Sequence, residues 1–302
     1  MNIGFIGLGR MGLNMVRRLT AGGHGIFATA RTTAKKAEAE EVGARWVSDL
    51  SDFVTALEAP RVVWVMVPSG QPTGELIASL TQALSPGDII VDGGNSDHRD
   101  TARRAGEVAA RGLRFVDCGT SGGIWGLQNG YCLMIGGDKS AVDHLAPVFT
   151  TLAPPGGWLH VGPAGHGHYV KMIHNAIEYG MMQAYAEGFE LLRRHCGESL
   201  DLAEVSRLWN QGSVVRSWLL ELSERVFAES PDLAYLKGRV DDSGECRWAL
   251  ESAISEGVPA PVFAAALFTR FASHTEDGFG NRYLAALRNQ FGGHAITRRP
   301  SE

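Results

Sequence analysis

Asn2-Ile-Gly-Phe-Ile-Gly-Leu-Gly-Arg-Met-Gly12 is a short apolar run that continues into glycines at positions 7, 9 and 12. A helical pattern from Leu13 to Ala21 follows directly, and Gly22 and Gly23 end it. The GxGxxG spacing between a strand and a helix is typical of a dinucleotide-binding turn, which needs a tight turn, close approach of a pyrophosphate and close helix–strand packing. The stretch therefore predicts a nucleotide-binding βα unit; a glycine-rich turn that binds no nucleotide is the alternative.

Further apolar runs alternate with helical patterns through the first half of the chain. The runs that we expect to be strands are 25–30, 61–67, 87–92, 113–117 and 132–136. This alternation predicts a parallel, doubly wound sheet with helices on both faces. Ligands of such sheets bind beyond the carboxyl ends of the strands. We therefore expect Asn95 and the segment Ser121, Gly122 and Gly123, which follow two of these runs, to take part in a ligand site.

Arg31 indicates which nicotinamide cofactor is bound. An NAD-binding fold usually has an acidic residue about twenty residues after the glycines, on the ribose 2′-hydroxyl. The chain has no acidic residue between Gly12 and Glu38, and Arg31 lies near the expected position. An arginine there suits a 2′-phosphate and favours NADP over NAD; an arginine that only stacks on adenine is the alternative. The residues expected to contact the cofactor are Gly7, Leu8, Gly9, Arg10, Met11, Gly12, Arg31, Thr32, Val67, Pro68 and Asn95.

The second half of the chain has helical patterns throughout, with Pro231, Pro259 and Pro261 at expected helix boundaries. We expect an α/β Rossmann-type domain over residues 1–162 and an all-α domain for substrate binding and dimerisation over residues 163–302.

Composition narrows the classes of protein that need to be considered. The chain has 302 residues, 44% of them hydrophobic and 20% charged, and a net charge of −5, which is typical of a globular protein and does not favour a nucleic-acid partner. No apolar run is long enough for a membrane span, and no signal peptide precedes the first strand. The four cysteines lack the spacing of a metal site or a disulfide framework. We expect a cytoplasmic protein without a metal.

A loop closed by Gly165 and Gly167 leads into a long helical pattern that continues to about Arg194 and carries two different faces. The apolar face, which we expect to point into the core, consists of Val170, Ile173, Ile177, Met181 and Ala184. The polar face consists of Lys171, His174, Asn175 and Glu178. Because lysines and carboxylates are almost never fully buried unless paired, the polar face lies either in solvent or in a site.

Together these motifs resemble the 6-phosphogluconate dehydrogenase family, the decarboxylating enzymes of the pentose phosphate route, in its short form. The segments that carry the resemblance are GFIGLGRMG (4–12), VDGGNSDHRDT (91–101), GTSGG (119–123), GHGHYVKMIHNAIEYGMMQ (165–183) and RNQFGGH (288–294). They span nearly the whole chain. The Lys-Met-x-His-Asn-x-Ile-Glu-Tyr run distinguishes this family from the related β-hydroxyacid dehydrogenases.

The resemblance implies a role for each residue that matches a family motif. Lys171 is the implied catalytic lysine, Asn175 its partner and Glu178 the catalytic acid. The implied substrate contacts are Asn95, Ser121, Gly122, Gly123, His174, Tyr179, Arg270, Arg288 and His294. The family also implies a small anionic sugar acid as substrate, and a homodimer or homotetramer whose C-terminal tail completes a neighbouring subunit's site.

One stretch departs from the family pattern. Where the long form has Lys-Gly-Thr-Gly-Lys-Trp, which contacts the substrate phosphate, this chain has Ser243-Gly-Glu-Cys-Arg-Trp248. Glu245 would repel a phosphate if it faced the pocket. Arg239 and Arg247 are candidates to replace the missing ligands, and the phosphorylated state of the substrate stays open. In the cofactor motif, Ala30 replaces the family's asparagine.

The polar groups suit oxidation followed by decarboxylation. Neutral Lys171 would take the proton of the substrate 3-hydroxyl, protonated Lys171 and Asn175 would stabilise the ketone oxygen as carbon dioxide leaves, and Glu178 would protonate C1. His174 would either orient its neighbours or act itself. One alternative is a β-hydroxyacid dehydrogenase that does not decarboxylate and needs no acid such as Glu178. The other is a catalytically silent Rossmann-type protein, against which the joint presence of Lys171, Asn175 and Glu178 argues.

Overall fold

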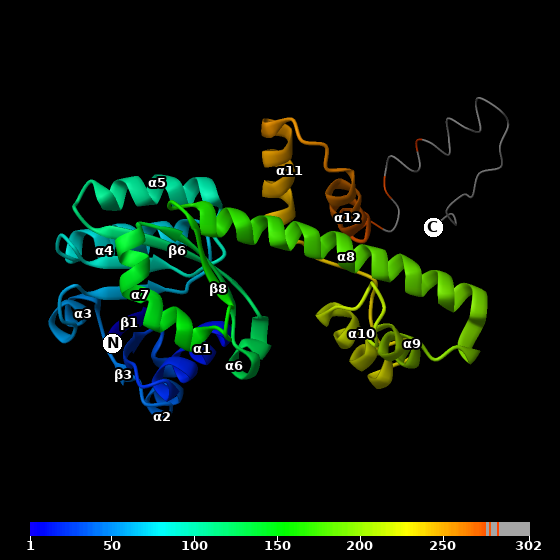
Figure 1. Cartoon of the computed structure of the whole chain (residues 1–302), viewed down its shortest axis with the longest axis horizontal. Coiled ribbons are helices and arrows are strands. Elements are labelled where there is room, and N and C mark those ends of the chain that lie inside the picture. The colour runs from blue at the N-terminus through cyan, green and yellow to red at the C-terminus, as the bar shows by residue number, and fades with distance from the viewer. Residues whose placement is uncertain (276–277, 279–282, 284–302) are drawn as a thin grey trace, which may run out of the picture. The chain divides into compact units, whose positions relative to one another are not determined.

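The computed structural model of the chain describes residues 1–275, 278 and 283 (Figure 1). Contacts between Cα atoms divide the chain into two units, 1–174 and 175–302, which are described separately. The division falls inside helix α8 (His166–Cys196), which is one unbroken helix.

An eight-stranded sheet forms the centre of the first unit, in the order β3-β2-β1-β4-β5-β6-β7-β8. The strands are β1 (Asn2–Ile6), β2 (Gly25–Thr29), β3 (Arg45–Trp46), β4 (Val62–Val65), β5 (Ile89–Asp92), β6 (Arg114–Ser121), β7 (Cys132–Gly137) and β8 (Trp158–Gly162). Strands β1 to β6 are all parallel. The predicted doubly wound α/β sheet is confirmed in this part.

The pairing of β7 with β6 differs from the prediction of a parallel sheet. Strand β7 runs antiparallel to β6, with Val116 opposite Gly137 and Ser121 opposite Cys132. This partner gives residues 118–121 a continuous set of backbone hydrogen bonds, so β6 continues to Ser121 where the sequence predicts that it ends at residue 117. Ser121 therefore lies at the end of a rigid strand.

Helices cover both faces of the sheet. Helices α1 (Arg10–Ala21), α2 (Lys36–Glu41) and α7 (Lys139–Leu152) pack on one face, and α3 (Leu50–Ala56), α4 (Gln71–Ala83) and α5 (His98–Ala109) pack on the other. Adjacent strand residues point to opposite cores, because Trp64 lies in the first and Val63 and Val65 in the second. The shorter elements are the helix α6 (Gly126–Asn129) and the 3-10 turns 33–35, 123–125 and 197–199.

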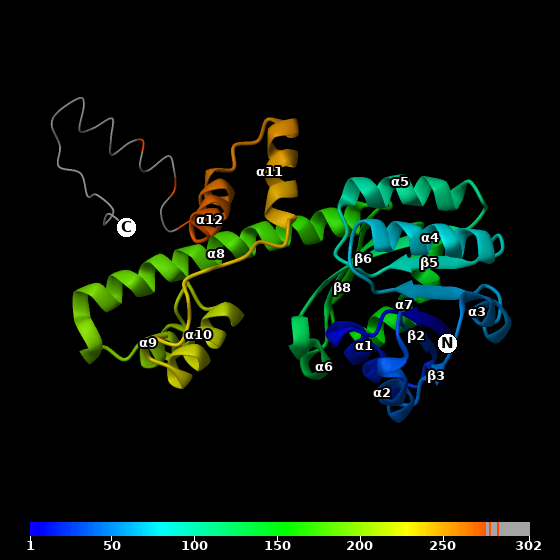
Figure 2. The ribbon, with the colours of Figure 1, turned by 180° about the vertical axis from the view of Figure 1, so that it is seen from behind.

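The second unit is helical in its described part. It contains α9 (Leu202–Trp209), α10 (Trp218–Glu229), α11 (Glu245–Glu256) and α12 (Pro261–Ala272), together with the C-terminal half of α8. Helix α9 packs on α10 and α11 packs on α12, and in both views the two pairs lie on opposite sides of α8 (Figures 1 and 2). The predicted all-α second part is confirmed; the helix expected from residue 281 lies outside the described residues.

Helix α8 faces the opposite way from the prediction. The apolar face is exposed, with Val170 at 38%, Ile177 at 49% and Met181 at 38%, whereas Lys171 is 9% exposed. The reason is Gly167, one turn before Lys171. A Cβ at residue 167 would lie 2.5 Å from the Met134 carbonyl oxygen, so the glycine lets this side of the helix, and not the apolar side, approach the sheet. The prediction of a core-facing apolar stripe is therefore wrong within this chain.

Candidate active site

The glycine turn after β1 has the geometry that a dinucleotide needs. Gly7 has a φ of +107°, and its N–H donates to the Thr29 carbonyl oxygen at 2.9 Å. A Cβ at residue 12 would lie 2.1 Å from the Gly7 carbonyl oxygen, so only glycine permits the observed helix–turn packing. A Cβ at residue 9 would meet no heavy atom of the described chain within 4 Å, which leaves room for a phosphate at the N-terminus of α1. The glycine turn and the start of α1 therefore fit the pyrophosphate of a dinucleotide cofactor.

The other residues expected at the cofactor lie near the same edge of the sheet. Strands β2, β1 and β4 are parallel neighbours, so their carboxyl ends lie together. Arg31 and Thr32 follow β2 and are exposed, and Val67 and Pro68 follow β4. Within the turn, Arg10 is exposed, Met11 is half-buried and Leu8 is buried in the core, so Leu8 would offer a cofactor only its backbone.

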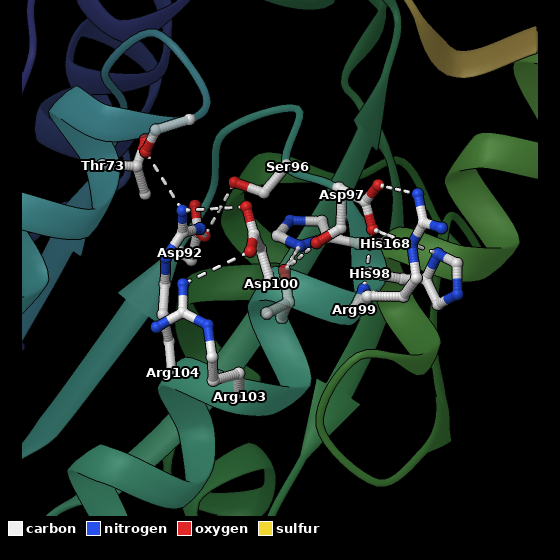
Figure 3. Close-up of polar contacts among 12 residues, drawn as sticks. Thr73, Asp92, Ser96, Asp97, His98, Arg99, Asp100, Arg103, Arg104 and His168 are labelled. Carbon is white, nitrogen blue, oxygen red and sulfur yellow. Dashed lines mark hydrogen bonds and ion pairs between the residues drawn. The ribbon is translucent and has the colours of Figure 1, made fainter. Parts of the chain in front are cut away.

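A buried arginine of α5 joins the loop after β4 to the end of β5 (Figure 3). The Nη2 atom of Arg104 donates to the Gly70 carbonyl oxygen at 3.0 Å, and Nη1 lies 3.7 Å from Asp92 Oδ2. Asp92 in turn accepts from the Gly94 N–H at 3.1 Å and from Ser96 Oγ at 2.9 Å. These bonds fix the loop that carries Asn95, which is itself exposed.

The start of α8 is anchored by two other buried side chains. Asp117 of β6 accepts from the N–H groups of Gly165 and His168, both at 2.8 Å, and so takes the place of an N-cap. The His168 ring Nδ1 lies 2.8 Å from Thr101 Oγ1 of α5. These positioning residues were not predicted from the sequence. An acidic residue inside an apolar strand, as at Asp117, is the signal that could have revealed one of them.

Lys171, His174 and Ser121 form a connected chain of polar groups in the first unit. Lys171 Nζ lies 3.4 Å from His174 Nδ1, and His174 Nε2 lies 3.2 Å from Ser121 Oγ. An ammonium can only donate, so a charged Lys171 requires Nδ1 to accept and places the ring proton on Nε2, toward Ser121. Loss of a proton from Lys171 can therefore be followed by a change of the His174 tautomer. Gly122 and Gly123 directly follow Ser121, with φ values of +131° and +53°.

In the second unit, Asn175 and Tyr179 of α8 meet the stretch that departs from the family pattern. Asn175 Nδ2 donates to Glu245 Oε1 at 2.9 Å, and Ser243 Oγ donates to Glu245 Oε2 at 2.5 Å. The Ser243 N–H also donates to Tyr179 Oη at 3.0 Å. Glu245 is only 3% exposed. Glu178, three residues after Asn175 on the same helix, is half-buried.

The arginines of the second unit are partly engaged with neighbouring groups. The guanidinium of Arg270 lies over the Tyr179 ring, 3.4 Å from its centroid, and donates to the Asp241 carbonyl oxygen at 3.1 Å. Arg247 pairs with both carboxylate oxygens of Asp242 at 2.8 and 2.9 Å, and this hydrogen bond lowers the pKa of Asp242. Arg239 lies 3.3 Å from Asp241. Arg288 and His294 lie outside the described residues.

Two further properties concern residues 1–275. No group of three or more His, Cys, Asp or Glu side chains gathers there in a way that could hold a metal ion. No helix in the same part of the chain is both long and apolar enough to span a membrane.

Two family models match the chain almost end to end. The model described as the NAD binding domain of 6-phosphogluconate dehydrogenase matches residues 2–162, and that of the 6-phosphogluconate dehydrogenase C-terminal domain matches residues 167–294. The chain belongs to the 6-phosphogluconate dehydrogenase family. This confirms the resemblance inferred from the sequence, and with it an oxidoreductase of the NAD(P)-binding class.

Individual members of the family agree with the match. A Haloferax volcanii protein named 6-phosphogluconate dehydrogenase, NAD(+)-dependent, decarboxylating, is 41% identical, and the alignment covers 99% of each chain. The solved 6-phosphogluconate dehydrogenase of Plasmodium falciparum, described with NADP+ and with 6-phosphogluconate, superposes with a TM-score of 0.84 at 28% identity and covers all of this chain and 67% of its own. A 3-hydroxyisobutyrate dehydrogenase of Mycobacterium tuberculosis superposes with a TM-score of 0.71 at 23% identity. The match covers 90% of this chain and 94% of that protein, and it shows a shared fold alone.

Proposed function

We propose that the protein oxidises and decarboxylates 6-phospho-D-gluconate to ribulose 5-phosphate and carbon dioxide, with reduction of NAD(P). The observation that supports this most is the buried Lys171, which lies 3.4 Å from His174 in a chain that belongs to the 6-phosphogluconate dehydrogenase family. The Haloferax volcanii and Plasmodium falciparum proteins are both named 6-phosphogluconate dehydrogenase, and that name states this substrate.

The oxidation step is assigned to Lys171. The glycine turn and the start of α1 would hold NAD(P), and the cofactor would supply the acceptor for the hydride from C3 of the substrate. Lys171 as the neutral amine removes the proton from the 3-hydroxyl in the same step, and its burial favours that form because desolvation disfavours a charged amine. His174 and Ser121 hold the lysine in place through their own contacts.

The decarboxylation step is assigned to the next two turns of α8. Protonated Lys171 and the Asn175 amide stabilise negative charge on the ketone oxygen as the C1 carboxylate leaves. C1 is released as carbon dioxide, and Glu178 then donates a proton to the former C2, which becomes C1 of ribulose 5-phosphate. Asn95, Ser121, Gly122, Gly123, Tyr179 and Arg270 are assigned to substrate binding by their match to the family motifs.

Initial rates with 6-phosphogluconate and with gluconate, each with NADP and with NAD, test the reaction. We expect stoichiometric carbon dioxide and reduced cofactor from 6-phosphogluconate. Reduced cofactor without carbon dioxide would instead identify a β-hydroxyacid dehydrogenase, the family whose fold is shared. Turnover of gluconate alone would exclude a phosphorylated substrate.

We also propose NADP as the preferred cofactor, because Arg31 is exposed two residues after the end of β2 and no acidic residue precedes Glu38. The Haloferax volcanii relative, by contrast, is named NAD(+)-dependent. The Arg31→Ala variant should raise KM for NADP and leave KM for NAD nearly unchanged. Arg111→Ala removes an exposed arginine elsewhere in the same unit and serves as the control. An equal effect of Arg31→Ala on both cofactors would refute a role in phosphate recognition.

A homodimer or homotetramer is proposed from the exposed apolar stripe of α8, formed by Val170, Ile177 and Met181. A stripe of this kind on a helix marks a protein contact. Ile177→Glu should therefore lower the mass measured by light scattering, whereas Val214→Glu, at a residue 99% exposed outside the stripe, should not. If the wild type is already a monomer, the proposal is wrong.

The C-terminal residues Arg288 and His294 are proposed to contact substrate in a neighbouring subunit. Mixing and reassociating the inactive variants Lys171→Met and Arg288→Ala tests this. If the tail acts in trans, mixed oligomers contain some intact sites and regain part of the activity. If it acts within its own subunit, every site carries a defect and the mixture stays inactive.

A further inference from the structure

We propose that Glu245 is a positioning residue that fixes the orientation of the Asn175 carboxamide for the reaction. The inference rests on the proposed function, because it assigns Asn175 a catalytic role. Glu245 lies in the stretch that departs from the long-form family pattern. Its carboxylate was expected to repel a substrate phosphate if it faced the pocket.

The hydrogen bonds around Glu245 show which groups its carboxylate contacts. Both carboxylate oxygens accept a hydrogen bond, one from Asn175 Nδ2 at 2.9 Å and one from Ser243 Oγ at 2.5 Å. Glu245 is also the first residue of the twelve-residue helix α11, where the helix dipole stabilises a negative charge. The carboxylate is thus held by its neighbours although it is 3% exposed.

The chemistry of these groups permits only one orientation of the amide. The oxygen and nitrogen of an asparagine side chain are alike in shape, so packing alone does not distinguish the two ways round. A carboxylate only accepts hydrogen bonds, however, so the Asn175 atom that faces Glu245 has to be Nδ2. The flipped amide would bring Oδ1 within 3 Å of a carboxylate oxygen, with two acceptors in repulsive contact.

The consequence for the reaction follows from the planarity of the amide. Once one N–H of Nδ2 points to Glu245, the directions of the second N–H and of Oδ1 are fixed as well. Stabilising an oxygen that gains negative charge requires a donor that is already aligned, because an aligned donor does not have to reorient during the step. Glu245 supplies that alignment from a residue 70 positions away in the sequence.

The backbone around Glu245 supports the same role. Gly244 has a φ of +102°, which a side chain would strain, and the Gly244 N–H donates to Asp242 Oδ1 at 3.2 Å. Ser243 is held in turn by Tyr179, to which its N–H donates. The stretch 242–245 therefore presents the Glu245 carboxylate to Asn175 in a fixed position.

Substitution of Glu245 tests the proposal in the full-length enzyme. Glu245→Met removes both acceptors at similar side-chain length and should lower kcat about ten- to a hundredfold, the effect of a misplaced catalytic group. KM for the cofactor should not change. Glu245→Gln keeps an acceptor oxygen for Asn175 and should restore most of the rate. Glu256→Met, the same substitution at an exposed position of α11, is the control and should leave kcat unchanged.

A double-mutant cycle separates positioning from a general structural effect. In an Asn175→Ala background, Glu245→Met should cause no further loss of kcat, although its effect on Tm should persist. Independent, multiplicative losses of kcat would overturn the proposal, and so would a Glu245→Met enzyme with wild-type kcat.

One measurement does not depend on the substrate. In ¹⁵N-labelled protein, assigned by comparison with Asn175→Ala, the side-chain amide signals of Asn175 should shift in Glu245→Met and remain close to their wild-type positions in Glu245→Gln. Unchanged signals in Glu245→Met would overturn the proposal even if the enzyme turned over another acid. Shifted signals in a protein that does not act on 6-phosphogluconate would instead refute only the proposed function. If Glu245→Met does not fold, Ser243→Ala, which removes the second donor to Glu245, should give a smaller shift of the same signals.

Discussion

At the scale of single residues, Lys171 has the largest expected effect. Lys171→Met removes the proposed base without adding a charge to the buried position, and we expect kcat to fall by about 10²–10⁴-fold. Cofactor affinity, measured by fluorescence titration with NADPH, should stay within twofold or so of wild type, because the glycine turn is a separate part of the first unit. A variant with near-normal turnover would remove Lys171 from the mechanism.

The four cysteines should differ in reactivity. Cys132 is exposed, whereas Cys118 and Cys246 are buried. Burial raises the pKa of Cys246 to about 11 and raises that of Cys118 as well, so both stay protonated and unreactive at pH 7.5, because the thiolate is the nucleophile. Iodoacetamide should therefore modify Cys132 first, as mass spectrometry of peptides would show.

Modification of Cys132 should also lower activity. Cys132 lies directly opposite Ser121 in the β6–β7 pair, and side chains opposite one another project on the same side of a sheet. A carboxamidomethyl group there would stand beside a residue assigned to substrate. Substrate should slow the inactivation, and Cys132→Ser should resist it. Full activity after complete labelling would contradict the placement of substrate near Ser121.

At the scale of elements, the glycines of α8 allow a matched comparison. A Cβ at residue 167 would lie 2.5 Å from the Met134 carbonyl oxygen and 2.7 Å from the Gly136 nitrogen, whereas a Cβ at residue 188 would meet no heavy atom of the described chain within 4 Å. Gly167→Ala should therefore destabilise the fold by about 1–3 kcal/mol. Gly188→Ala should stabilise it by about 0.5–1 kcal/mol. Urea unfolding followed by circular dichroism measures both, and equal effects would contradict the close approach at residue 167.

The glycine turn and helix α8 differ in how far they could be predicted from the sequence. The turn at Gly7, Gly9 and Gly12 was predictable because its three requirements are local to eleven residues. The buried face of α8 was not, because the 3.6-residue period reveals that two faces exist without telling which of them meets the sheet. The deciding contact is made by Gly167 with β7, more than thirty residues earlier in the chain.

The roles of single polar groups were predictable only in part. Lys171 and Asn175 stood out because a family motif contains them. Glu245 was recognised as a departure, but its partner is 70 residues away and only the folded chain joins the two. Asp117 looked like the end of a strand, and its bonds to Gly165 and His168 depend on the start of α8.

At the scale of the whole molecule, the exposed stripe of α8 has a consequence for stability. An assembly that forms only in the folded state stabilises it by mass action. The apparent Tm should therefore rise when the protein concentration increases from micromolar to hundreds of micromolar. Ile177→Glu should have a Tm that does not depend on concentration. A wild-type Tm that is also independent of concentration would argue against a dissociable assembly through this stripe.

The continuity of α8 restricts how the enzyme could be regulated. Lys171, Asn175 and Glu178 lie on one unbroken helix, so their Cα atoms keep a spacing of about 10 Å from first to last, set by the helical rise alone. In enzymes whose reactive groups come from separate lobes, a hinge that opens also pulls the catalytic set apart. In this protein one continuous helix fixes the spacing of the three residues. A hinge motion would change the access of substrate and cofactor to these proposed catalytic residues, but the distances among their Cα atoms would stay the same.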